Sequence, residues 1–116
     1  MVDCGRLPDL PFEITPAEVK AKLDAGEALR LLDVREPGEH ALCWIEGARL
    51  IPMRSIPEHI NELDDEGAPL IVFCHHGVRS LSVVDWLRRQ GMGNCMSMSG
   101  GIDLWSIHID PSVPRY

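Results

Sequence analysis

The sequence lacks any long run of apolar residues. The longest apolar stretch near its central cysteine, Leu70–Cys74, is far too short to span a bilayer. Residues Met1–Gly5 also lack a basic region followed by an apolar stretch, so no secretory signal is expected. With 45% hydrophobic and 25% charged residues, the composition is typical of a globular protein, and we expect a cytoplasmic location and no membrane partner.

Positive charge is also scarce. The chain has 11 lysines and arginines against 18 aspartates and glutamates, which gives a formal net charge of -7. A chain this acidic is not expected to bind nucleic acid or anionic membranes. An anionic substrate would therefore need a local positive site within the negative body.

Closely spaced cysteines are absent. The four cysteines are Cys4, Cys43, Cys74 and Cys95, and no two of them form a C-x-x-C pair, so no structural zinc site is predicted. Disulfides are not the default in a cytosolic chain. Cys43 and Cys95 are adequately explained as small buried hydrophobic residues. Cys74 requires a different account.

No repeat, low-complexity segment or linker divides the 116 residues. We predict one domain over residues 1–116, with a loose N-terminus at 1–10 and an irregular C-terminal tail at 108–116. Short apolar runs predict strands at 29–34, 48–51, 70–74 and 95–98, and helices are predicted before, between and after them. Strands that alternate with helices indicate an α/β domain with a mostly parallel sheet.

Three predicted helices carry specific signals. Thr15 and Glu18 have the spacing of a capping box at the start of a helix that ends near Ala25. Ser55 and Glu58 repeat this spacing before a second helix. In a third helix, at 80–90, the side chains expected to face the core are Leu81, Val84 and Leu87.

Cys74 follows the strongest predicted strand and precedes the helix at 80–90. In parallel α/β folds, ligands gather at the carboxyl ends of the strands. A loop that leads into a helix N-terminus aims backbone N–H groups at one point, and the helix dipole favours negative charge there. These features favour a Cys74 thiolate, which is the nucleophilic form. On local features alone, the alternative is that Cys74 merely ends a buried strand.

The loop after Cys74 also carries positive charge. His75, His76 and Arg79 would supply the positive site that the acidic body lacks, and Gly77 allows tight curvature. A metal site formed by Cys74, His75 and His76 is not expected. Adjacent residues on a tight loop cannot easily converge on one ion, and no fourth ligand is evident.

Four ordered motifs resemble the rhodanese superfamily. They are Leu32–Pro37, Ile45–Pro52, Cys74–Ser80 and Gly100–Trp105. The resemblance covers nearly the whole chain from Thr15 onward, and four motifs in order are more specific than any single one. In one departure, many relatives have Gly-His-Ile where this chain has Cys43-Trp44-Ile45.

The resemblance implies a three-layer α/β domain around a five-stranded sheet, and a sulfurtransferase that needs no metal or organic cofactor. Cys74 would attack the outer sulfur of a small anionic donor such as thiosulfate and carry that sulfur as a persulfide. A thiol, cyanide or a sulfur-carrier protein would then accept it, and nothing in the sequence demands more than a monomer. The residues implied in substrate binding are His75, His76, Gly77, Val78 and Arg79.

Asp33, Arg35 and Ser80 are expected to support the loop. Asp33 and Arg35 stand at the end of a predicted strand, where a buried ion pair would orient the loop. Two other functions stay open. A Cys-based phosphatase or arsenate reductase has a Cys-x5-Arg loop, whereas the shorter interval from Cys74 to Arg79 fits a single sulfur atom better. A non-catalytic rhodanese-like module that binds a partner protein is the second, although such modules commonly lack the cysteine.

Overall fold

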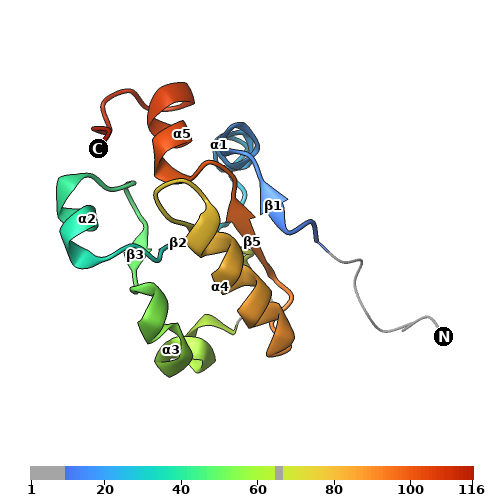
Figure 1. Ribbon diagram of the computed structural model, residues 1–116. Coiled ribbons are helices and arrows are strands. Elements are labelled where there is room, and N and C mark those ends of the chain that lie inside the picture. The colour runs from blue at the N-terminus through green and yellow to red at the C-terminus, as the bar shows by residue number, and fades with distance from the viewer. Residues whose placement is uncertain (1–9, 65–66) are drawn as a thin grey trace.

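A computed structural model describes residues 10–64 and 67–116 (Figure 1). Its centre is a five-stranded sheet in the order β1-β5-β4-β2-β3, and every neighbouring pair of strands is parallel. The α/β fold expected from the sequence is thereby confirmed. The strands are β1 (Glu13–Ile14), β2 (Arg30–Asp33), β3 (Arg49–Leu50), β4 (Leu70–Phe73) and β5 (Cys95–Met98).

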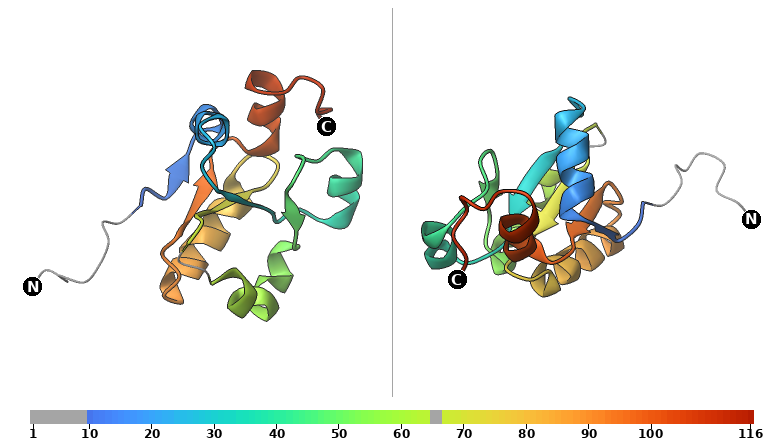
Figure 2. Two further views of the ribbon diagram at one scale, coloured as in Figure 1. Left: turned by 180° about the vertical axis from the view of Figure 1, so that it is seen from behind. Right: turned by 90° about the horizontal axis from the view of Figure 1, so that it is seen from above.

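Helices cover both faces of the sheet and make three layers (Figure 2). Buried side chains of α1 and α5 belong to the apolar cluster on one face, and those of α3 and α4 belong to the cluster on the other. No helix among the described residues is long and apolar enough to cross a membrane. The helices are α1 (Pro16–Asp24), α2 (Pro37–Leu42), α3 (Ile56–Leu63), α4 (Val78–Arg89) and α5 (Gly101–His108), with a short 3₁₀ turn, η1 (Met53–Ser55), before α3.

Strand β4 is buried on both faces. Leu70 and Val72 belong to the apolar cluster beneath α3 and α4, whereas Ile71 and Phe73 belong to the cluster beneath α1 and α5. Side chains of a strand alternate between faces, so a strand covered on both sides needs apolar residues at every position. This is why the segment reads as a continuous apolar run, and it places the end of β4 in the middle of the molecule.

The first helix begins as its sequence indicates. The Thr15 hydroxyl accepts the N–H of Glu18 at 3.1 Å, and the Glu18 carboxylate accepts the N–H of Thr15 at 3.0 Å. The matching prediction at Ser55 is wrong, because Ser55 lies in the 3₁₀ turn with helical backbone angles and makes no side-chain cap. Leu81 is also wrongly assigned: it is exposed, and Val83 faces the core with Val84.

The structure describes the C-terminal tail of the chain but not residues 1–9. Residues 1–9, which hold Cys4 and most of the N-terminus predicted to be loose, lie outside the described residues. After α5 the chain continues without helix or strand to Tyr116. This tail is held by a buried Val113 and by a hydrogen bond from the Ser106 hydroxyl to the Val113 carbonyl.

Candidate active site

Cys74 is the first residue after β4, between the ends of β2 and β5. Three residues separate it from the start of α4, so the chain must turn sharply. Gly77 makes the turn with a φ of +104°, and a side chain there would lie 3.1 Å from the backbone nitrogen of Gly100. The left-handed backbone and the close neighbour both require glycine. The loop thus brings the N-terminus of α4 over the thiol.

Backbone N–H groups point at the sulfur. The N–H of Gly77 donates to Sγ of Cys74 at 3.1 Å, and that of Ser80 donates at 3.4 Å. The Ser80 hydroxyl lies 3.5 Å from the same sulfur and is itself held by a 2.8 Å hydrogen bond with Ser97. Cys74, Ser80 and Ser97 are all buried. Two N–H donors at a helix N-terminus stabilise negative charge on this sulfur atom.

The start of α5 fixes the carbonyl side of the same loop. The N–H groups of Ile102 and Asp103 donate to the carbonyls of Cys74 and His75 at 2.9 and 3.1 Å. A side chain at Gly101 would overlap both carbonyl oxygens, and its φ of +59° is left-handed. Gly101 is therefore required by the close contact between α5 and the loop, whereas Gly100 has a left-handed φ of +74° and a side chain there would overlap Leu104.

Arg79 does not lie open to a ligand. Its guanidinium makes a two-pronged ion pair with the Glu39 carboxylate of α2, at 2.7 and 2.9 Å. This pairing with Arg79 lowers the pKa of Glu39 to about 2, and Glu39 in turn raises the pKa of Arg79. The positive charge that the sequence places beside Cys74 is therefore balanced by a carboxylate 40 residues earlier in the chain.

Asp33 and Arg35 form a fully buried ion pair, with 2.7 Å between Nη2 of Arg35 and Oδ2 of Asp33. The guanidinium also donates to the carbonyl of Cys43 at 2.7 Å and to that of Glu39 at 3.2 Å. The expected ion pair is present, but what it holds directly is the segment of α2 rather than the loop of Cys74. Cys43 is buried in this contact, while Trp44 is exposed.

Tyr116 is the residue of the site that the sequence did not indicate. Its hydroxyl donates to Glu39 at 2.8 Å and accepts from Arg35 at 3.1 Å. Its ring stacks on His75 with 3.8 Å between ring centroids. Burial raises the pKa of Tyr116 to about 12. No local pattern reveals this role, because Tyr116 lies in the irregular tail, 77 residues from Glu39.

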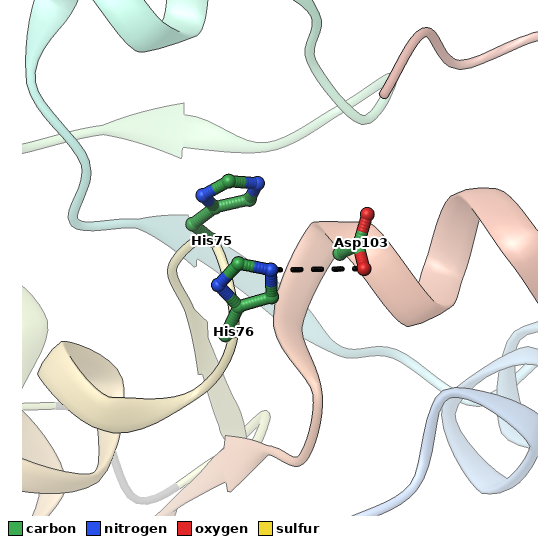
Figure 3. Close-up of side chains that lie close together, drawn as sticks. All are labelled: His75, His76 and Asp103. Atoms are coloured by element: carbon green, nitrogen blue, oxygen red, sulfur yellow. Dashed lines mark ion pairs between the residues drawn. The ribbon is translucent and has the colours of Figure 1, made fainter. Parts of the chain in front are cut away.

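The two histidines have different environments. His75 is stacked between Tyr116 and His76, and burial, followed by the charge of His76, lowers its pKa. His76 is mostly exposed, with Nε2 at 3.7 Å from Oδ2 of Asp103 (Figure 3). Val78 is the first residue of α4, and its side chain is 76% exposed, so only its backbone is part of the packed loop.

From the sequence, no metal site is expected at Cys74, His75 and His76. Among the described residues, the two histidines instead group with Asp103 of α5. The thiol of Cys74 is not in this group. The sequence does not indicate Asp103, because only the fold brings α5 to the loop.

A pocket of about 440 Å³ opens next to the loop, on the side of His76 and Val78. Two carboxylates, Glu13 and Asp85, line it. Since these carboxylates repel anions, this pocket does not suit an anionic donor. The negative charge of such a donor is better met by the N–H groups that point at Cys74.

Comparison with known proteins agrees with this geometry. Residues 15–108 match the family model described as a rhodanese-like domain. The chain is 35% identical over 112 residues to the thiosulfate sulfurtransferase GlpE of Stutzerimonas stutzeri, which covers 97% of this chain and 93% of that protein. A crystal structure of a rhodanese-like domain protein from Staphylococcus aureus superposes with a TM-score of 0.77 at 31% identity, over 91% of this chain and 99% of that chain.

Other relatives are much longer. The chain is 35% identical over 91 residues to the chloroplastic rhodanese-like/PpiC domain-containing protein 12 of Arabidopsis thaliana, which covers 75% of this chain and 30% of that protein. It therefore spans less than a third of that relative. The family match nevertheless extends over most of the chain and includes every residue from the first helix to α5. The chain belongs to the rhodanese-like domain family.

Proposed function

We propose that this protein is a sulfurtransferase, which moves sulfane sulfur from thiosulfate or a similar small anionic donor to a thiophilic acceptor through Cys74. One observation carries the proposal: the N–H groups of Gly77 and Ser80 lie 3.1 and 3.4 Å from Sγ. They stabilise a thiolate before the reaction and would hold a persulfide after it. Relatives that match this chain over most of their own length include two thiosulfate sulfurtransferases, GlpE, and their names support the choice of thiosulfate as donor.

The reaction has two displacements. In the first, the Cys74 thiolate attacks the outer sulfur of thiosulfate, a new S–S bond forms, and sulfite leaves with the electron pair of the old S–S bond. In the second, an acceptor thiolate or cyanide attacks the terminal sulfur of the persulfide, and Cys74 leaves as a thiolate. No net proton or electron is required from the protein, so the chain needs only to stabilise sulfur anions.

An anionic donor first contacts backbone N–H groups rather than Arg79. Arg79 is engaged by Glu39 at 2.7 and 2.9 Å, so it reaches a donor only after that ion pair opens. We therefore assign the first contact to the N–H groups at the start of α4, and to Arg79 a role in fixing α2 against the loop. This arrangement also disfavours a phosphatase, in which an arginine two-pronged on a tetrahedral oxyanion would be needed.

The test is intact-protein mass spectrometry after incubation of the reduced protein with thiosulfate. The parent should gain one sulfur atom, cyanide should remove it, and Cys74→Ser should gain none. Cys95→Ala is the matched control, since Cys95 is buried and burial raises the pKa of its thiol. This variant should gain sulfur as the parent does.

A folded, reduced parent that gains no sulfur would refute the transfer from thiosulfate. Such a result would favour the partner-binding module as the function of the domain. A gain that persists in Cys74→Ser would instead move the reaction to another cysteine, which would also contradict the proposal.

A further inference from the structure

Two imidazoles and a carboxylate converge beside the active-site loop. His75 and His76 directly follow Cys74, and Asp103 lies in the first turn of α5 (Figure 3). One ligand atom from each of the three side chains lies within 4.8 Å of the other two. We propose that His75, His76 and Asp103 bind a divalent transition-metal cation such as Zn²⁺, without a ligand from Cys74.

The distance between His76 and Asp103 is close to that between two ligands of a metal ion. Bonds of about 2.0–2.2 Å from zinc to nitrogen and oxygen place neighbouring tetrahedral ligands about 3.3–3.5 Å apart. Nε2 of His76 already lies 3.7 Å from Oδ2 of Asp103. The His76 side chain is 62% exposed, so it can rotate to close the remaining gap without disturbing the core. His76 is therefore the movable ligand of the three.

The other two ligands are held in place by the backbone. The N–H of Asp103 donates to the carbonyl of His75 at 3.1 Å, so the two residues are joined before any ion binds. Gly101 permits this contact, because a side chain there would overlap that carbonyl. A site whose ligands stand on joined segments loses little conformational entropy on binding.

Neighbouring side chains orient the ligands. Arg115 donates to both carboxylate oxygens of Asp103, from Nε to Oδ1 at 2.8 Å and from Nη2 to Oδ2 at 3.3 Å, so it positions the carboxylate while its positive charge opposes that of a bound cation. The His75 ring is stacked on Tyr116, at 3.8 Å between ring centroids, and this contact stays in place when His76 rotates. Nε2 of His75 is buried and has no hydrogen-bond partner among the described residues. A buried polar atom without a partner is costly, and a metal bond would satisfy it.

The donor set selects the class of ion. Two imidazole nitrogens and one carboxylate oxygen suit Zn²⁺, and also Ni²⁺ or Cu²⁺, better than Mg²⁺ or Ca²⁺, which prefer sites made of oxygen atoms. Three protein ligands leave a fourth position for water or an anion. The proposed site is thus of the open kind and lies on the loop that holds the thiol.

The experiment is a calorimetric titration with Zn²⁺ alone in a Cys4→Ser, Cys74→Ser background, so that neither the thiol of Cys4, which lies outside the described residues, nor that of Cys74 can bind the ion. His76→Ala and Asp103→Asn should each weaken Zn²⁺ binding about tenfold or more. The matched control is His59→Ala. His59 and Glu62 also form an exposed histidine–carboxylate pair, with 2.6 Å between them, but within residues 10–64 and 67–116 no third ligand groups with them. This control should bind Zn²⁺ as the background does.

Arg115→Ala separates a metal ligand from a structural contact. It removes the cationic partner of Asp103 and keeps all three ligands, so Zn²⁺ binding should be unchanged or tighter. Weakening in Arg115→Ala equal to that in Asp103→Asn would overturn the proposal, as would an unchanged affinity in His76→Ala. Because the background lacks Cys74, the result is independent of whether the protein transfers sulfur.

Discussion

Gly101→Ala is the sharpest test of how α5 supports the site. The substitution places a methyl group against the carbonyl oxygens of Cys74 and His75, at a backbone φ of +59°. The chain can relieve the overlap only by moving α5 away from the loop. That movement breaks the two hydrogen bonds that Ile102 and Asp103 donate to the loop at 2.9 and 3.1 Å.

The magnitude follows from these two terms. A left-handed backbone costs an alanine about 1–2 kcal/mol, and each lost hydrogen bond costs about 1 kcal/mol. Gly101→Ala should therefore lower the free energy of unfolding by about 3–4 kcal/mol. Gly26→Ala is the matched control, because Gly26 has a φ of +80° and nothing lies within 4 Å of its added methyl group. It should lose only the backbone term of about 1–2 kcal/mol.

The assay is urea unfolding of the parent and both variants, together with sulfur uptake from thiosulfate. The free energies of unfolding of the two variants should differ by about 2 kcal/mol, which in thermal unfolding corresponds to roughly 10 °C in Tm. Gly101→Ala should also take up sulfur more slowly, because the carbonyl side of the loop has moved. If Gly101→Ala is no less stable than Gly26→Ala, the close contact between α5 and the loop does not hold the site together.

Two groups beside the loop should titrate outside their ordinary ranges. Arg79 lowers the pKa of Glu39 from 4.5 to about 2, so the ionised carboxylate contributes stability that is complete above about pH 4.5 and is lost as the pH falls toward 2. In urea unfolding, Glu39→Gln should lose about 1 kcal/mol at neutral pH and depend less on pH in this acid range, whereas parallel curves would contradict the ion pair. Tyr116 is the one tyrosine of the sequence, so ultraviolet absorbance reports it alone, and ionisation near pH 10 rather than near 12 would show that the tail does not pack on His75.

The elements that the sequence predicts well are those with a strong local pattern. Strand β4 is a continuous apolar run because both faces are buried, and the first helix has a complete capping box. The sequence does not predict strand β1, because this strand has only two residues, Glu13–Ile14, and its place in the sheet depends on pairing with β5. Two residues carry too little pattern to distinguish a strand from a loop.

The wrong predictions at Ser55 and Leu81 have local causes as well. The Ser-x-x-Glu pattern at Ser55 predicts an extended cap, but η1 runs directly into α3 and leaves Ser55 with helical angles. In α4 the buried seam is Ser80, Val83, Val84 and Leu87 rather than the line through Leu81. The seam begins at Ser80 because that residue packs under the thiol, so the site sets the rotation of the helix.

The candidate site also has one part that the sequence predicts and another that it does not. The loop from Cys74 to Ser80 is contiguous in sequence, and its N–H groups lie where a strand–loop–helix unit puts them. The partners of that loop come from elsewhere: Glu39 from α2, Asp103 from α5 and Tyr116 from the tail. Their side chains are ordinary surface types, and only the three-dimensional fold brings them to the loop.

These distant partners explain why two motifs far apart in the sequence belong to one site. Arg35, buried on Asp33, holds the carbonyls of Glu39 and Cys43 and thereby fixes α2. Helix α2 then presents the Glu39 carboxylate to Arg79. The first motif therefore acts on the loop of Cys74 through the ion pair of Glu39 and Arg79. Breaking a buried ion pair on one side leaves an unpaired charge, so the pair of Asp33 and Arg35 fixes α2 in one position. The contacts to the Cys74 thiol are made by the backbone N–H groups of the loop.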